Sequence, residues 1–298
     1  MLKLIFLGVN GSLQDTDSGN TSLLVTGKEG SLAVDLSCNL AAVVNAGVDA
    51  VILTHEHIDH VYGLPSLLHQ MWIAGRGKAL DIYVPQGLEQ LADGLIHLFG
   101  LREKKNMFEI RLRTEPVFCV GTMKVTTFPT DHTEMSIGVV IEDGMESGME
   151  DGMEGSMGDD MEDTIEDVMK DVRGKLVYTC DTRPLRDIPS FMEGAQVLIH
   201  EASGLSKEEE ALLRKGHSSG ADAGKMAREL GVDKLYLCHL PRGEEAKSQI
   251  LREAKMVFGE SFIPEVLGEI AVSGREGRVR TNLQRFVTNT DNDAIVKS

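Results

Sequence analysis

The chain has 298 residues, of which 42% are hydrophobic and 26% are charged, and its formal net charge at pH 7 is −17. The sequence has no run of roughly 18 apolar residues, which excludes a transmembrane helix. Its four cysteines form no CxxC pair, which argues against a disulfide framework. We therefore expect a globular α/β protein that is cytoplasmic and does not contact a membrane.

The predicted elements begin with a strand at residues 1–8, a hydrophobic run too short for the core of a signal peptide. An apolar, β-branched run at residues 50–54 predicts a buried strand. Residues 66–72 have the apolar periodicity of a helix. The loop between these two elements contains the hexapeptide His55-Glu56-His57-Ile58-Asp59-His60.

This loop has the composition of a metal site. Imidazole nitrogen and carboxylate oxygen are the ligands that suit zinc and its neighbours. Because side chains alternate along an extended segment, His55 and His57 point the same way and can bind one ion. Asp59 and His60 lie where the chain turns, so they can reach a second ion.

Three later strands are predicted to end on further candidate ligands. Residues 124–130 are followed by Asp131 and His132, residues 175–180 by Asp181, and residues 234–238 by His239. In layered α/β proteins, functional groups collect at the carboxyl ends of strands. The sequence therefore predicts that these residues converge with the hexapeptide on one metal centre.

Taken together, these motifs resemble the metallo-β-lactamase superfamily over roughly residues 1–285. Within it the chain is most similar to the ribonuclease Z-like phosphodiesterases. Four segments are similar to loops of that branch: residues 59–65 (DHVYGLP), 178–184 (YTCDTRP), 198–203 (LIHEAS) and 216–221 (GHSSGA). The first is shared across the superfamily, whereas the last two are more particular to the ribonuclease Z branch. The resemblance implies a four-layer αβ/βα sandwich formed by a single domain at residues 1–286, with halves at about 1–140 and 175–286.

The resemblance also implies a role for each candidate residue. One metal ion would be held by His55, His57 and His132, a second by Asp59, His60 and His239, and Asp181 would bridge them. The implied catalytic residues are Asp59, His217 as proton donor and Glu201 as its orienter. The two ions would be divalent, with zinc expected first and manganese or iron as alternatives.

The activity implied is hydrolysis of a phosphodiester bond by a hydroxide that bridges the two ions. The expected partner is a phosphodiester substrate, either RNA or a small cyclic or diester nucleotide, and a homodimer is an open alternative to a single chain. Two other classes stay open: a lactonase or thioesterase type of hydrolase, and a non-enzymatic protein that binds metal and a partner.

An acidic segment separates the two halves. Residues 142–171 contain 13 acidic residues and one basic residue, a net charge of −12. We predict a flexible insertion rich in Gly, Met and Glu at residues 142–173, because glycine and like-charge repulsion both oppose a helix. Residues 287–298 are predicted to be a polar tail.

The substrate loop departs from the ribonuclease Z pattern. Residues 8–20 contain no Lys or Arg, whereas the family has cationic residues in this loop. An acidic insertion would also repel a phosphate backbone. Both departures favour the small-nucleotide alternative over tRNA.

Overall fold

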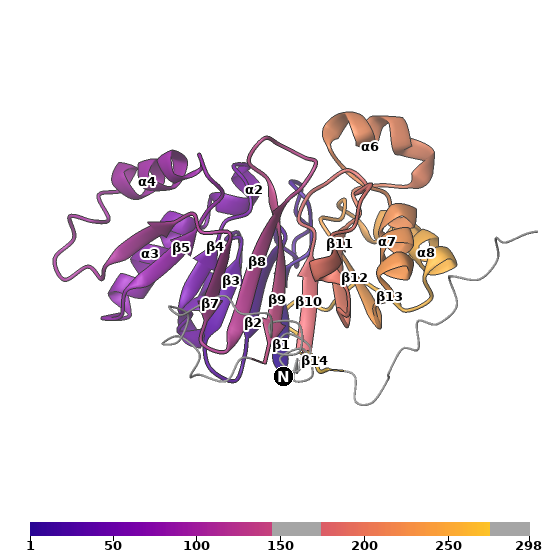
Figure 1. Ribbon diagram of the computed structural model, residues 1–298. Helices are drawn as coiled ribbons and strands as arrows, with labels where there is room; N and C mark the ends of the chain where they lie inside the picture. Colours follow the sequence, from indigo (N-terminus) through magenta and orange to yellow (C-terminus); the bar gives the residue numbers. More distant parts are fainter. Residues whose placement is uncertain (145–173, 275–298) are drawn as a thin grey trace, which may run out of the picture.

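The computed structural model describes residues 1–144 and 174–274. Two seven-stranded sheets pack face to face, with helices on their outer surfaces (Figure 1). This arrangement confirms the predicted four-layer αβ/βα sandwich. Among the described residues, no helix has both the length and the apolar character needed to cross a membrane.

The first sheet is antiparallel at one end and parallel at the other. Its order is β14-β1-β2-β3-β4-β5-β6, and the pairs from β3 to β6 are parallel. Its strands are β1 (Leu2–Gly8), β2 (Ser22–Thr26), β3 (Ser31–Val34), β4 (Ala50–Ile52), β5 (Leu80–Tyr83), β6 (Ile110–Arg113) and β14 (Glu269–Val272). The helices between them are α1 (Leu40–Ala46), α2 (Ile58–Val61), α3 (Leu64–Ile73) and α4 (Glu89–Leu98).

The second sheet repeats this plan in the order β13-β12-β11-β10-β9-β8-β7. Its strands are β7 (Val117–Val120), β8 (Met123–Pro129), β9 (Ile137–Asp143), β10 (Gly174–Tyr178), β11 (Val197–Glu201), β12 (Lys234–Cys238) and β13 (Ser261–Phe262). Its helices are η2 (Ser190–Met192), η3 (Ser206–Glu208), α6 (Glu209–Lys215), α7 (Gly220–Leu230) and α8 (Glu244–Val257).

Alternation along the strands divides the core into two parts. Leu4 and Phe6 of β1 face the second sheet, where Ile141 and Leu176 belong to the same buried cluster. Leu7, one residue on, belongs instead to the cluster that packs against α3 and α4. Each sheet therefore buries both faces, and removal of this apolar surface from water holds the layers together.

The two sheets do not divide the chain near residue 140. The strands β7, β8 and β9 belong to the second sheet, because β9 pairs antiparallel with β10 from Gly174↔Asp143 to Tyr178↔Val139. The expected halves of about 1–140 and 175–286 thus differ from the observed sheets. The extent of the single domain, 1–286, stays a prediction.

The acidic insertion begins later than residue 142. Glu142 and Asp143 are the last residues of β9, and each has a partner. Glu142 forms an ion pair of 3.0 Å with the buried Lys175, and Asp143 accepts a hydrogen bond of 2.8 Å from Thr122. These partners keep both carboxylates in the strand. The remainder of the predicted insertion, and the predicted tail at 287–298, lie outside the described residues.

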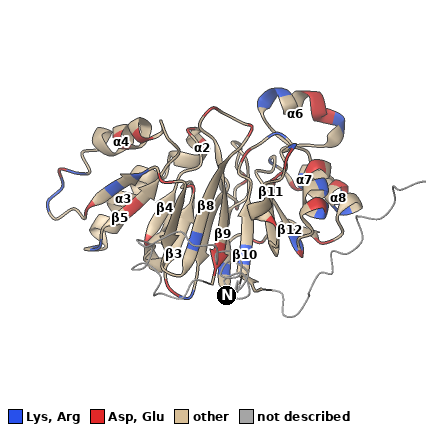
Figure 2. Ribbon diagram, in the orientation of Figure 1, with Lys and Arg blue, Asp and Glu red and all other residues tan. Residues whose placement is uncertain are grey.

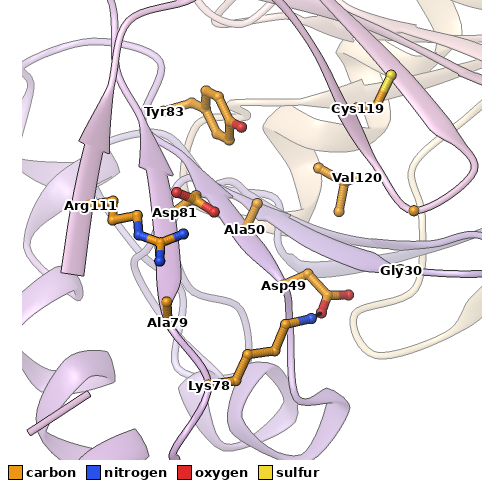
Figure 3. A pocket seen from close by; sticks show the side chains of 11 residues that line it. Gly30, Asp49, Ala50, Lys78, Ala79, Asp81, Tyr83, Arg111, Cys119 and Val120 are labelled. Carbon is orange, nitrogen blue, oxygen red and sulfur yellow. Dashed lines mark hydrogen bonds and ion pairs between the residues drawn. The ribbon is translucent and has the colours of Figure 1, made fainter. Parts of the chain in front are cut away.

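The sheets leave a cavity of about 500 Å³ where β5 and β6 approach β7 (Figure 3). It is lined by Asp49 and Ala50, at the start of β4, and by Lys78 and Asp81, at the start of β5. Lys78 pairs with Asp49, so these charges satisfy each other. Because the cavity lies at the amino ends of these strands, it is separate from the residues predicted to bind metal, which follow the carboxyl ends.

We predict that residues 145–173 are dispensable for folding. The β9–β10 register is fixed by the strands themselves, and shortening a loop recovers about 0.6 kcal/mol for each halving of its length. Replacement of 145–173 by a short Gly/Ser linker should keep or raise the free energy of unfolding, by about 1–2 kcal/mol in urea melts.

The matched control removes residues 142–173, which leaves Lys175 buried without Glu142, and should be clearly less stable. Loss of the cooperative transition in the shorter deletion would contradict this prediction.

Candidate metal centre

The predicted ligands meet at one edge of the sandwich, in α2 and directly after β4, β8, β10 and β12, elements that Figure 1 labels. His55 and His57 follow β4, while Asp59 and His60 lie in the one-turn helix α2. His132 follows β8, Asp181 follows β10 and His239 follows β12. The structure therefore brings all seven residues together, as the sequence predicted.

Three histidines form the first ligand cluster, defined as His55, His57 and His132. His57 Nδ1 lies 3.1 Å from His55 Nε2 and 3.0 Å from His132 Nε2. The Oδ2 atom of Asp181 lies 3.8 Å from His55 Nε2 and 3.7 Å from His132 Nε2. These four ligand atoms lie within 4.8 Å of one another, close enough to surround one cation.

The second ligand cluster consists of Asp59, His60 and His239. His239 Nε2 lies 3.5 Å from Asp59 Oδ2 and 3.0 Å from Asp181 Oδ2. His60 Nε2 lies 3.8 Å from Asp59 Oδ2 and 3.5 Å from Asp181 Oδ2. The same oxygen of Asp181 thus faces both clusters, as a bridging ligand would.

Two buried atoms of this site fit a metal better than they fit the protein alone. Within residues 1–144 and 174–274, His60 Nε2 and Asp181 Oδ1 are buried and have no hydrogen-bond partner. A buried polar group without a partner is costly, and folded proteins rarely leave one. A cation at this place would be coordinated by the imidazole and the carboxylate, so the residues present fit a metal ion.

Four of the five candidate ligand histidines are oriented through their other ring nitrogens, an arrangement common around bound metals. The pairs are His55 Nδ1 with Thr54 Oγ1 at 3.1 Å, His60 Nδ1 with Asp35 Oδ2 at 2.7 Å, His132 Nδ1 with Gly216 O at 2.8 Å, and His239 Nδ1 with Ser203 Oγ at 3.0 Å.

Asp35 is a functional residue that the sequence reasoning missed. It is fully buried at the end of β3, with a positive φ of 57°. Besides His60, it accepts hydrogen bonds from Thr54 N and Thr54 Oγ1, both at 2.8 Å. It therefore fixes both the metal loop and a ligand of the second cluster. The rule applied to the other ligands, an acidic residue directly after a strand, would have found it.

Burial and charge set the protonation of the ligands. Burial, together with the nearby His60, lowers the pKa of His55 to about 2. Its imidazole is thus neutral, the form that binds metal. Burial also opposes charge on His60, yet Asp35 and Asp181 outweigh it and hold the pKa of His60 well above its ordinary value. The carboxylates thus favour positive charge at this position, which a divalent cation supplies.

The predicted catalytic pair also forms. Glu201 is fully buried at the end of β11, and its Oε1 lies 2.9 Å from His217 Nδ1. The same carboxylate accepts hydrogen bonds from Thr182 N at 2.9 Å and from Ser203 Oγ at 2.7 Å. Glu201 is therefore held in place independently of His217, so it can orient the imidazole.

The ring of His217 lies between the two clusters. Its centroid is 4.8 Å from that of His132 and 5.1 Å from that of His239, on which it stacks at 23°. Ligand-type atoms of Asp181, His217 and His239 lie within 4.8 Å of one another. His217 can therefore reach a group bound at the metal centre.

The other three histidines lie apart from this pair and the clusters. His69 and His97 are partly or largely exposed on α3 and α4. His200 is buried, and its Nδ1 lies 2.7 Å from the carbonyl oxygen of Glu201. None of the three belongs to either ligand cluster or to a candidate metal-binding group among the described residues.

Two ribonucleases Z are similar to this chain over nearly their whole length. Ribonuclease Z of Methanothermobacter thermautotrophicus is 27% identical over 300 residues, covering 91% of this chain and 97% of the relative. Ribonuclease Z of Archaeoglobus fulgidus is also 27% identical, covering 89% and 96%.

Solved structures share the fold. The metallo-β-lactamase fold protein YhfI of Bacillus subtilis superposes with a TM-score of 0.67 at 21% identity, covering 90% of this chain and 98% of that one. Human tRNase Z, short form, gives a TM-score of 0.65 at 17% identity, covering 91% and 99%. The family model described as "Beta-lactamase superfamily domain" matches residues 38–240. Because that match spans more than half of the chain and includes all seven candidate ligands, the chain belongs to the β-lactamase superfamily.

Proposed function

We propose that the chain is a dinuclear metal-dependent hydrolase of phosphodiester bonds, of the ribonuclease Z type. The observation that carries the proposal is the shared carboxylate of Asp181 between two ligand clusters, with the Glu201–His217 pair beside them. The curated relatives named ribonuclease Z, which match along nearly their whole length, support the same activity.

Each cluster would hold one divalent ion. The first would be bound by His55, His57 and His132, the second by Asp59, His60 and His239, and both by Asp181. Five imidazoles and two carboxylates favour zinc, with manganese or iron as the metals to compare. The Zn²⁺-bound PqqB of Methylobacterium extorquens has the same fold, with a TM-score of 0.59. When bound, two such ions supply Lewis acidity and make water acidic enough to act as a nucleophile.

The protein's own contribution to the reaction is proton transfer. A leaving alkoxide needs a proton, and a histidine oriented by a carboxylate is suited to donate it. Because Nδ1 of His217 pairs with Glu201, its Nε2 atom is the one that would donate a proton to the leaving group of the substrate. Asp59 would act in catalysis as a ligand that places charge beside the scissile bond.

The surroundings of the centre bear on the substrate. Arg183, two residues after Asp181, uses its guanidinium within the protein and not for the substrate: it donates hydrogen bonds to Leu213 O at 2.6 Å and to Asp131 Oδ1 at 2.8 Å. The loop of residues 8–20 carries Asp15 and Asp17 and no cation. RNA remains the substrate that the relatives suggest, and these two features favour a small cyclic or diester nucleotide as the second candidate. The four cysteines, all within the described residues, form no disulfide, which fits a reducing compartment, so we propose a cytoplasmic location.

We expect hydrolysis of bis-p-nitrophenyl phosphate with Zn²⁺ or Mn²⁺, and of either a tRNA precursor or cyclic AMP. A lactone is the control for the other hydrolase class. Turnover of the lactone without turnover of any phosphodiester would contradict the proposal, and the ratio of RNA to cyclic AMP turnover decides between the two substrates.

A second prediction separates proton transfer from metal binding. His217→Ala should retain both ions by elemental analysis and lose roughly 10²–10⁴-fold in rate on unactivated diesters. The loss should be smaller with p-nitrophenolate, which leaves without a proton. His97→Ala, at an exposed position, is the matched control and should keep the rate and the ion count of the unsubstituted protein. Loss of an ion, or an equal loss with both leaving groups, would refute the proton-donor role.

We also propose that the chain forms a homodimer through an apolar groove beside the metal loop. The groove has a volume of about 740 Å³ and lies between α2, α3 and α4. Of its lining residues, Ile58 is 75% exposed, Leu98 74% and Phe99 58%. These residues belong to elements with few charges (Figure 2), and exposed apolar patches of this kind mark interfaces.

A second copy fits this groove because its charges are self-complementary. Glu56 and Lys104 both line it, one in the metal loop and the other after α4. In an interface with twofold symmetry, residue i meets residue j of the partner and j meets i. Glu56 of each copy can therefore pair with Lys104 of the other copy.

Light scattering should give a mass of twice the 32.5 kDa chain. Leu98→Glu should reduce it to a single chain, because it places a charge in the apolar interface. Met256→Glu on α8, at a methionine that is 87% exposed, is the control and should stay dimeric. A single-chain mass for the unsubstituted protein, or an unchanged dimer in Leu98→Glu, would disprove the interface.

A further inference from the structure

The loop between β1 and β2 packs directly against the second ligand cluster. We call residues 9–21 the N-terminal loop. It contacts Asp59 and His239, the two ligands that the second cluster draws from opposite halves of the molecule. The loop is therefore placed to influence one ion and not the other.

Ser12 is its contact with Asp59. Ser12 Oγ donates a hydrogen bond of 3.1 Å to Asp59 Oδ2. That oxygen is the one that lies 3.5 Å from His239 Nε2 and 3.8 Å from His60 Nε2. A hydrogen bond to a ligand carboxylate fixes its orientation, so Ser12 directs the oxygen that would bind the metal.

Backbone contacts hold His239 in the same way. His239 N donates to Thr21 Oγ1 at 2.9 Å, and the flanking residue Leu240 exchanges backbone hydrogen bonds of 2.9 Å with Val9 O and Gly11 N. A Cβ on Gly11 would lie 3.0 Å from the His239 ring, so the loop approaches the imidazole closely. His239 has a φ of 50°, which is unfavourable for a residue with a side chain and needs such support.

The loop is itself tied to the second half of the fold by an ion pair. Lys247 of α8 is only 5% exposed, and its Nζ lies 2.6 Å from Asp15 Oδ2. Asp15 also accepts hydrogen bonds from Asn10 Nδ2 at 2.9 Å and from Gly243 N at 3.1 Å. A buried ammonium needs such a partner, so the pair fixes the loop to α8.

We propose that the N-terminal loop is a positioning element for the second metal ion: Ser12 orients Asp59, and the Lys247–Asp15 pair holds the loop in place. This inference rests on the two-ion site proposed above. The first cluster is oriented by other groups, since His55 pairs with Thr54 and His132 with Gly216. The loop should therefore act on the affinity of one ion alone.

The test is a stepwise Zn²⁺ titration of the metal-stripped full chain, with a chromophoric chelator as competitor and native mass spectrometry to count the ions. The unsubstituted protein should bind two. Ser12→Ala should lower the affinity for the ion of the second cluster by roughly 10–100-fold, the usual cost of losing a contact to a ligand, and leave the affinity for the ion of the first cluster unchanged. Ser12→Thr should restore the affinity, because it keeps the hydroxyl at an exposed position.

Lys247→Met keeps most of the side-chain volume but removes the ion-pair partner of Asp15, so it should reproduce the selective loss seen with Ser12→Ala. Lys225→Met is the matched control, because it removes an exposed pair with Asp222 of similar length, 2.8 Å, on the neighbouring helix α7. This control should bind both ions as the unsubstituted protein does.

Two results would overturn the inference. If Lys247→Met lowers the affinity for both ions equally, the Lys247–Asp15 pair only stabilises the fold. If the affinities of Ser12→Ala lie within twofold of those of the unsubstituted protein, Ser12 does not position Asp59. A single ion in the unsubstituted protein would overturn it together with the two-ion proposal. The ion count distinguishes that case from one in which two ions bind but the N-terminal loop has no effect on them. Neither the ion count nor the Zn²⁺ affinity depends on which substrate is cleaved.

Discussion

The carboxylate of Asp181 is the constraint on which the rest of the structure depends. It is buried, and its Oδ2 atom faces ligand nitrogens of both clusters at 3.0–3.8 Å. Burial favours the protonated acid, yet the neighbouring His239 and His60 hold the pKa of Asp181 well below its ordinary value. An ionised carboxylate at this depth requires positive charge around it, and the surrounding ligands are arranged to share a cation with it.

The layered fold meets this requirement because strand ends from both sheets converge on one edge. β3 and β4 supply Asp35 and the metal loop, while β8, β10 and β12 each supply a ligand from the second sheet. The strands themselves are buried on both faces, so their positions are fixed by packing. The loops that follow them therefore present polar side chains from a rigid base, as a preorganised site needs.

The sequence contained enough information to predict which residues gather at the candidate metal centre, because strand periodicity and donor chemistry both point to the same residues. His55, His132 and His239 were identifiable one by one as polar residues directly after apolar runs. The orienting contacts were harder to predict. Ser203 and Gly216 touch ligands from distant segments, and serine and glycine carry no signal that separates this use from an ordinary turn.

The division of the chain between the sheets was also beyond the sequence. Whether the strands after Thr114 pair with the first sheet or the second depends on long-range register, and their local pattern is the same in both cases. The buried pair of Lys247 and Asp15 could not be predicted from the sequence either, because a single lysine on a helix is ordinarily a solvated residue.

The central claim is that two ions share Asp181, and anomalous diffraction from zinc-loaded crystals tests it most directly. Data collected on both sides of the zinc absorption edge should show two peaks roughly 3.5–4 Å apart, one within each ligand cluster, with the Asp181 carboxylate between them. A single peak, or two peaks of which neither contacts Asp181, would contradict the account.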